Sequence, residues 1–437
     1  MGSVAGFPYF EVRFDKQANP VAAAEVDALL GHVREARPTD VVVLAHGWNN
    51  DMAQARTLFE TLCGNMRDAL DRTGAEAIGE RTFAVLAVLW PSKKFADRDL
   101  IPGGAASLAA APEATTLQLE LRNLHGAFDA PDADSKLVRA EALVARLDDD
   151  AQAQHEFVEI MRALLPADTG SAEKRDEVPP ELYDRDPAEM LLDLGEDDGT
   201  PAPHGLGGAA SVGAAAGLGS AFQEMKLGAR RLLNYVTYYQ MKERAGTVGE
   251  RGVAPLIRRL REPTSDPGPG GDRQNPRIHL VGHSFGGRLV AAVANASDPG
   301  AIASLSLLQA AFSHHGFSSR HGGFFRSVVA DGKVRGPILI THTANDTAVG
   351  IAYPIASRIG RQRASGLGDR NDPFGGIGRN GAVDSDEVIR QLLPVTGAYT
   401  FDAGKLHNLL ADGFIQDHGD VAGEEVAHAI VAAIAAS

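Results

Sequence analysis

The chain has 437 residues, of which 44% are hydrophobic and 23% are charged, so it is not a disordered tail and has room for more than one domain. Its formal net charge of −15 repels phosphate backbones, which argues against a nucleic-acid partner. The single cysteine, Cys63, excludes an internal disulfide and a zinc site built from cysteines.

The first twenty residues alternate polar and apolar side chains and contain no apolar stretch typical of a secretory signal. The sequence also lacks a long run of strongly apolar residues, since the uncharged stretch at 205–222 consists mostly of glycine and alanine. We therefore expect a cytoplasmic protein without an integral membrane segment.

Short apolar runs alternate with helical patterns through most of the chain. The apolar runs predict strands at 9–14, 41–45, 83–90, 277–281, 304–311, 336–341 and 405–411. Apolar stripes predict helices at 21–37, 52–70, 222–244, 288–295 and 424–436. This alternation predicts an α/β fold, in which helices cover a parallel sheet.

The alternation is interrupted between residues 100 and 214, which we assign to an insertion, leaving 1–99 and 215–437 as the core. The insertion contains a helical stripe that includes Phe157, Met161 and Leu164. An acidic run at 171–199 and a Gly/Ala tract at 201–219 follow, and we predict a flexible segment there. We expect a helical cap that selects substrates, and an intact fold after deletion of 171–213.

The strongest local motif is G-x-S-x-G, formed by Gly282, Ser284 and Gly286. It stands between a predicted strand and a predicted helix, which is the setting of a nucleophile elbow. In such a sharp turn, side chains two residues before and after the serine collide with neighbouring backbone. The motif therefore predicts that Ser284 is a nucleophile.

The GHSFGG sequence at 282–287, with HGWN upstream at 46–49, resembles the α/β-hydrolase superfamily, in particular its esterases and lipases. HGWN and the WPS sequence at 90–92 are also similar to a subgroup of these hydrolases. The resemblance covers the chain in order except for about 100–215. It implies an α/β-hydrolase fold, with a mostly parallel sheet, helices on both faces and an inserted helical cap.

An acyl-transfer nucleophile needs donors for the oxyanion that develops. One is expected from the backbone N–H of Phe285, the residue after the nucleophile. The resemblance implies the backbone N–H of Trp48 as the second, with the Trp48 indole also lining the acyl pocket. We assign His46 a structural role in this loop, and we count His283 and His314 among the substrate-binding candidates.

The chain order implied by the resemblance is serine, acid, histidine. Asp346 follows the strand predicted at 336–341, where the superfamily places its acid. Asp331 and Asp402 are weaker candidates, because one precedes its strand and the other lies in a glycine-flanked turn. A turn or helix-cap role for Asp346 also stays open.

Three histidines follow Asp346 in the chain: His407, His418 and His428. His418 lies in the loop between the last predicted strand and the last predicted helix, where the superfamily carries its base. His407 lies within that strand and is the weaker alternative. We therefore predict a Ser284–His418–Asp346 triad.

These residues predict a serine hydrolase that cleaves a small-molecule or lipid-like carboxylic ester through an acyl-enzyme. A peptidase, thioesterase or acyltransferase using the same triad stays open, as does a non-catalytic binding protein on the same fold. We expect no cofactor and no metal. The cluster of His314, His315 and His321 lacks the carboxylate or cysteine spacing of a zinc site.

Overall fold

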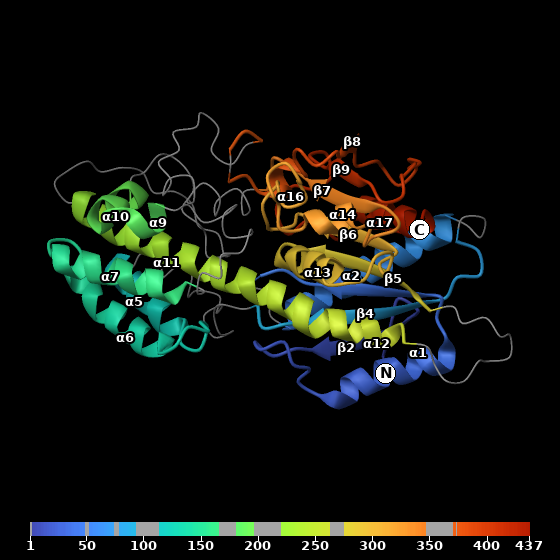
Figure 1. Cartoon of the computed structure of the whole chain (residues 1–437), viewed down its shortest axis with the longest axis horizontal. Helices are drawn as coiled ribbons and strands as arrows, with labels where there is room; N and C mark the ends of the chain where they lie inside the picture. The colour runs from blue at the N-terminus through green and yellow to red at the C-terminus, as the bar shows by residue number, and fades with distance from the viewer. Residues whose placement is uncertain are drawn as a thin grey trace. The chain divides into compact units, whose positions relative to one another are not determined.

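The computed structural model describes residues 2–48, 52–73, 78–92, 113–165, 181–195, 220–262, 275–346, 370–372 and 374–437. The chain divides into two compact units (Figure 1). The sheet unit comprises Met1–Ser92, Arg244–Val349 and Gly376–Ser437, and the helical unit comprises Lys93–Glu243 and Gly350–Gly375. Positions 99 and 215, where the boundaries were expected, lie outside the described residues. The second division falls at Glu243, so most of the helix predicted at 222–244 belongs to the helical unit and not to the expected core.

The described part of the sheet unit contains one mixed, mostly parallel sheet with strand order β1-β2-β4-β3-β5-β6-β7-β9-β8. Only β1 pairs antiparallel among these strands. The strands are β1 (Gly2–Val4), β2 (Phe7–Arg13), β3 (Asp40–Ala45), β4 (Phe83–Leu89), β5 (Arg277–His283), β6 (Ser304–Leu308), β7 (Ile338–His342), β8 (Val388–Gln391) and β9 (Leu406–Leu410). The predicted α/β architecture is confirmed.

The continuous apolar runs form the central strands. Every residue of β3 is buried, and so is all of β4 after its first residue. The seven predicted strands are confirmed to within a few residues at their ends. The sequence analysis missed β1 and β8, which lie at the two edges of the sheet; β8 has no buried residue and therefore no apolar run.

Helices of the sheet unit cover both faces of the sheet. These helices are α1 (Ala23–Ala36), α2 (Met52–Thr73), the π-helical segment η3 (Val248–Val253), α12 (Ala254–Leu260), α13 (Phe285–Asn295), α14 (Arg326–Ala330), α16 (Ile377–Asn380) and α17 (Glu424–Ala435). Helices α2 and α17 pack together over a cluster that includes Val42, Leu44 and Val281. Helix α13 packs against β3, β5 and β6.

The connections out of β3 and β5 run in opposite directions along the sheet. The chain passes from β3 through α2 to β4 on one side, and from β5 through α13 to β6 on the other. Because such crossovers are right-handed, α2 and α13 lie on opposite faces. Strands β3 and β5 therefore flank a topological switch point, where parallel sheets place their ligand sites at the carboxyl ends of the strands.

The helical unit is built from α5 (Glu113–Asn123), α6 (Ala133–Leu143), α7 (Ala151–Leu164), α9 (Glu181–Asp184), α10 (Pro187–Gly195) and most of α11 (Ser220–Thr247). The predicted stripe is confirmed, since Phe157, Met161 and Leu164 are fully buried in α7. Among the described helices, none is both long and apolar enough to cross a bilayer.

The acidic run was predicted to be flexible, and this is wrong for Glu181–Gly195, which form α9 and α10. Apolar side chains at helical spacing, among them Leu191 and Leu194, are fully buried despite the acidic neighbours. Helix α11 approaches so closely that a Cβ on Gly228 would lie 1.9 Å from the Leu191 carbonyl oxygen. Deletion of 171–213 would therefore remove packed helices. The rest of the acidic run and the Gly/Ala tract lie outside the described residues.

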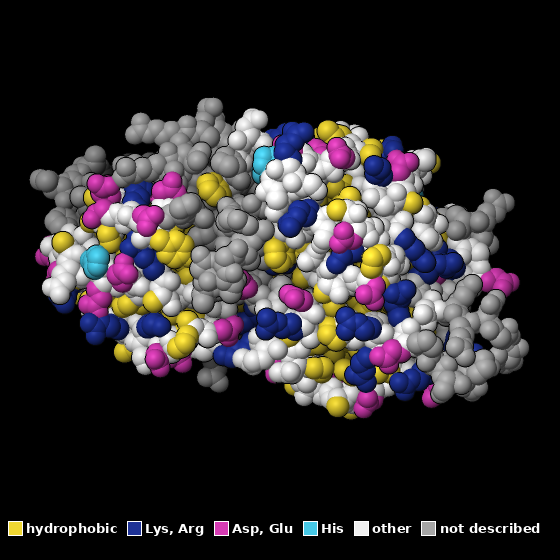
Figure 2. All heavy atoms as spheres, viewed as in Figure 1, with side chains coloured by type: hydrophobic (Ala, Val, Ile, Leu, Met, Phe, Trp, Pro, Cys, Tyr) yellow, Lys and Arg dark blue, Asp and Glu magenta, His cyan; other side chains and the backbone are white. Residues whose placement is uncertain are grey.

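The described surface carries both signs of charge. On the face drawn in Figure 2, Lys and Arg side chains are interspersed with Asp and Glu side chains over both units. Among the described residues on this face, the acidic side chains are thus not gathered into one patch.

Candidate active site

Ser284 lies at the junction of β5 and α13, with φ 55° and ψ −123°, a conformation that residues with a side chain rarely adopt. Backbone hydrogen bonds hold it there, the shortest of which are the following. The Ser284 N–H donates to the Leu308 carbonyl at 3.0 Å, and the Ser284 carbonyl accepts from Gly287 at 2.9 Å and from Ala311 at 3.1 Å. The predicted strand–turn–helix setting of the motif is confirmed.

The glycines of the motif are required by close backbone approach. A Cβ on Gly282 would lie 2.2 Å from the Gly286 carbonyl oxygen, and a Cβ on Gly286 would lie 2.2 Å from the Ala45 carbonyl oxygen. A Cβ on Gly47 would lie 2.8 Å from Ser284 Cβ. The steric reasoning from the sequence is therefore confirmed for Gly282 and Gly286, and the elbow and the loop after β3 are packed directly against each other.

The three residues predicted to form a triad are brought together. The Nε2 atom of His418 lies 2.8 Å from Ser284 Oγ, and its Nδ1 atom lies 2.9 Å from Asp346 Oδ2. Asp346 is fully buried just beyond β7, and His418 lies in the loop between β9 and α17. The His418 side chain is 15% exposed, so its ring borders on solvent.

The alternative residues lie elsewhere. The His407 ring, on β9, has its Nε2 atom 3.1 Å from the backbone nitrogen of Asp402, within the same turn. Asp331 caps the C-terminus of α14. Neither contact involves Ser284, so the geometry favours His418 and Asp346 over these residues.

The charge of Asp346 controls the protonation of His418. Burial by itself lowers the pKa of His418, but the Asp346 charge, the hydrogen bond to Asp346 and the nearby Asp417 charge together raise it, so the pKa lies above its ordinary value. Since the Asp346 carboxylate accepts from Nδ1–H, the neutral ring presents the lone pair of Nε2 to the Ser284 hydroxyl. This is the tautomer that a general base needs.

His283, a substrate-binding candidate, contacts the loop that carries His418. Its Nε2–H donates to the backbone carbonyl of His418 at 2.8 Å, and the two ring centroids are 4.9 Å apart. The ring is buried, which, together with the nearby His418, lowers the pKa of His283 to about 3. His283 is therefore a neutral donor at physiological pH. No sequence signal distinguished this role from substrate contact.

His46 connects the ends of β3 and β4. Its Nδ1–H donates to the Gly47 carbonyl at 3.0 Å, and its Nε2 accepts from the backbone N–H of Trp90 at 3.2 Å. The Trp90 indole N–H donates back to the His46 carbonyl at 3.0 Å. Complete burial lowers the pKa of His46 to about 4. These contacts give His46 the structural role expected for it.

The two residues expected to supply oxyanion donors lie close together. Phe285 is the first residue of α13, and its ring centroid lies 5.7 Å from that of Trp48. Trp48 follows Gly47, which lies so close to Ser284 that it has no room for a side chain. Both residues thus flank the elbow. Asn49, the last residue of the HGWN sequence, lies outside the described residues.

His314, the other substrate-binding candidate, is fully buried. Its ring packs edge-on against that of His315, and its Nδ1 atom lies 3.1 Å from the side-chain nitrogen of Asn380. These contacts do not link His314 to the triad.

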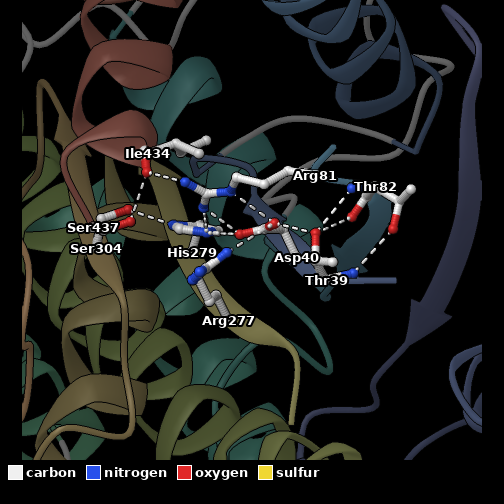
Figure 3. A network of polar contacts seen from close by, with 9 residues as sticks. All are labelled: Thr39, Asp40, Arg81, Thr82, Arg277, His279, Ser304, Ile434 and Ser437. Atoms are coloured by element: carbon white, nitrogen blue, oxygen red, sulfur yellow. Dashed lines mark hydrogen bonds and ion pairs between the residues drawn. The ribbon is translucent and has the colours of Figure 1, made fainter. Parts of the chain in front are cut away.

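A second Ser–His–Asp arrangement lies at the amino ends of the strands, and the sequence analysis missed it (Figure 3). The His279 ring has Nδ1 at 2.8 Å from Ser304 Oγ and Nε2 at 2.8 Å from Asp40 Oδ1. The Arg81 guanidinium also contacts both oxygens of Asp40, with Nε at 2.9 Å from Oδ2. The sequence pattern that could have revealed this arrangement is an aspartate and a histidine near the start of two apolar runs.

Scans and searches against protein-family models, curated proteins and solved structures found no match to this chain. The function is therefore inferred from the site itself.

Proposed function

We propose that this protein is a serine hydrolase of the α/β-hydrolase superfamily, which cleaves a carboxylic ester through an acyl-enzyme. One observation carries the proposal: Ser284, in a strained turn, has its Oγ 2.8 Å from His418 Nε2, while His418 Nδ1 is 2.9 Å from Asp346. A serine, a base and an orienting carboxylate within hydrogen-bond reach are the requirements of nucleophilic acyl transfer.

In the first half of the reaction, Ser284 Oγ attacks the ester carbonyl while His418 Nε2 takes its proton. The resulting imidazolium is stabilised by the charge of Asp346, which also keeps the ring in the correct tautomer. The carbonyl oxygen becomes an oxyanion, for which the backbone N–H groups of Trp48 and Phe285 are the proposed donors. As the tetrahedral intermediate collapses, His418 gives its proton to the departing alcohol oxygen.

In the second half, water attacks the acyl-serine carbonyl and His418 takes a proton from the water. Collapse of this intermediate releases the carboxylic acid and returns the proton to Ser284. The cycle uses only side chains and backbone groups of the sheet unit, and it needs no cofactor.

The proposed substrate is a small-molecule or lipid-like ester. A thioester or peptide substrate, or an acyl acceptor other than water, would use the same acyl-enzyme, so these alternatives have to be separated by assay. A panel of esters, thioesters and peptides of several chain lengths, with released acid and released alcohol or amine measured together, distinguishes them. Acyl transfer would give less free acid than leaving group.

The deciding experiment is labelling with a fluorophosphonate probe, which reacts covalently with activated serines. Wild-type protein is expected to be labelled and Ser284→Ala is not. Ser304→Ala is the matched control, because it removes the serine of the other Ser–His–Asp arrangement. Unlabelled, folded wild-type protein would favour the non-catalytic alternative, and labelled Ser284→Ala would exclude Ser284 as the nucleophile.

A further inference from the structure

Two histidines and one aspartate, distant in the sequence, meet on the surface of the sheet unit. His315 and His321 lie in the segment between β6 and α14, and Asp384 lies just before β8. One potential ligand atom from each of these residues lies within 4.8 Å of the other two. The His321 Nε2 atom is 2.9 Å from Asp384 Oδ2, and the two histidine rings are stacked with centroids 3.8 Å apart.

The two segments are held in register by hydrogen bonds that do not involve the three side chains. The Ser318 hydroxyl donates to the Asp384 carbonyl at 2.6 Å and accepts from the His321 backbone N–H at 3.3 Å. The Val383 N–H donates to the His314 carbonyl at 2.9 Å. The backbone thus positions the three side chains together before any ligand binds.

The donor set selects a class of ion. Two imidazole nitrogens and one carboxylate oxygen suit Zn²⁺ and its first-row neighbours, whereas Mg²⁺ and Ca²⁺ prefer oxygen donors alone. The Nδ1 atom of His315 lies 3.5 Å from the Val383 carbonyl, so a modest shift would let Nδ1–H donate there and leave Nε2 for a metal. Such a backbone partner for the second ring nitrogen is common among metal-binding histidines.

The surroundings allow an ion to enter. The side chains of His321 and Asp384 are 38% and 39% exposed, so water can complete the coordination. The Arg320 guanidinium lies 3.7 Å from Asp384 Oδ1 and competes for this carboxylate, but its side chain is 76% exposed and can move into solvent. Three protein ligands with one open position form a common arrangement for Zn²⁺.

We propose that His315, His321 and Asp384 bind a single first-row transition-metal ion of the Zn²⁺ class, which fastens the segment after β6 to the segment before β8. The inference does not depend on hydrolase activity. It also revises the reason for expecting no metal here, because the carboxylate missing from the local sequence is supplied by Asp384.

The test is calorimetric titration of the chelator-treated full chain with ZnCl₂, together with thermal unfolding at each metal concentration. We expect one ion per chain and a Tm that rises with Zn²⁺ but not with Mg²⁺. His321→Ala and Asp384→Asn should abolish this binding. Asparagine tolerates the φ of 55° at position 384, so Asp384→Asn removes the ligand charge without straining the turn.

Two further variants separate a built site from adventitious binding. Ser318→Ala leaves all three ligands and should weaken binding by about tenfold, since it removes only their support. His155→Ala, at an exposed histidine of α7, is the matched control and should bind as wild type does. The proposal is overturned if the wild type binds no Zn²⁺, or if His321→Ala and Asp384→Asn bind it with unchanged stoichiometry and affinity.

Discussion

The two ends of β5 carry two arrangements that are alike in their distances but differ in the setting of the serine and in the exposure of the histidine. His279, near the start of the strand, links Ser304 to Asp40, and His418, beyond its other end, links Ser284 to Asp346. In both, each nitrogen of the histidine lies within 3 Å of a serine hydroxyl or a carboxylate. Hydrogen-bond distances alone therefore do not distinguish the two arrangements, and a catalytic role is inferred from their surroundings.

What distinguishes the two arrangements is the serine and its setting. Ser304 lies in a regular strand and is 1% exposed, and the His279 side chain is fully buried. Ser284 has a positive φ at the start of a helix, and it faces a histidine that is 15% exposed. Only the second serine is placed where parallel sheets bind ligands, at the carboxyl ends of the strands.

The charges also differ. Burial by itself would raise the pKa of Asp40, but hydrogen bonds from Arg81, His279 and Thr39 keep that pKa well below its ordinary value. Burial lowers the pKa of His279, so that ring stays neutral despite the nearby carboxylate. Arg81 also donates to the Ile434 carbonyl at 2.9 Å, so this network ties α17 to the strands (Figure 3). It acts as a structural ion pair.

The sharpest test of the comparison removes each serine. Ser284→Ala should lower kcat by about 10⁶-fold, because the acyl-enzyme has no nucleophile left. Ser304→Ala should leave kcat within about twofold of the wild-type value, since the Ser304 hydroxyl is buried in the core and contacts His279 there. Ester hydrolysis by purified, folded variants measures both. Equal losses of kcat in the two variants would mean that the Ser304–His279–Asp40 arrangement takes part in catalysis.

Replacing each aspartate separates catalysis from stability. Asp346→Asn should lower kcat by about 10⁴-fold, since asparagine favours the wrong tautomer of His418. Asp40→Asn should spare kcat but lower the free energy of unfolding by on the order of 3 kcal/mol, because Arg81 keeps its buried charge without a partner. Denaturant unfolding and kinetics, measured on the same preparations, should show this crossed pattern. A folded Asp40→Asn enzyme without activity contradicts it.

The two networks should respond to different pH ranges. The pKa of His418 is raised above its ordinary value, so kcat/KM should fall about tenfold per pH unit below that pKa as the base becomes protonated. A pH–rate profile between pH 5 and about 9 measures this. A profile that stays flat down to pH 5 would exclude His418 as the base.

The free energy of unfolding should depend on pH through the Ser304–His279–Asp40 arrangement. Because folding lowers the pKa of Asp40, its carboxylate stabilises the fold above its ordinary pKa of about 4, and this stabilisation is lost as pH falls through the folded value. Asp40→Asn should therefore reduce the acid dependence of unfolding without moving the pH–rate profile. If it shifts the profile instead, the two networks are coupled.

The smallest expected effect tests His283 as a positioning residue. His283→Ala should lower kcat by about tenfold with little change in KM, because the loop that carries His418 loses its 2.8 Å hydrogen bond. His283→Gln keeps a side-chain N–H donor and should recover part of the loss. A large rise in KM with unchanged kcat would restore the substrate-binding role predicted from the sequence.

Local patterns determined much of this protein in advance. Apolar runs specify strands because a central parallel strand is buried on both faces, and the seven strands found this way match the sheet. The elbow at Ser284 could also be predicted from the sequence, since Gly282 and Gly286 lie where any Cβ would collide with backbone. The motif, the strand ends and the chain order that the resemblance implies predicted Ser284, Asp346 and His418, and these three side chains do meet.

The tertiary structure alone decided the contacts between distant segments. Because β3 and β5 are neighbours, Asp40 meets His279, and because the His418 loop folds over β5, His283 meets its carbonyl. Asp384 joins His315 and His321 for the same reason. In the acidic run, Leu191 and Leu194 are buried and α11 lies close to the Leu191 backbone, which favours helices that the charged composition did not predict. Such contacts depend on strand order and helix packing, which no local window of sequence contains.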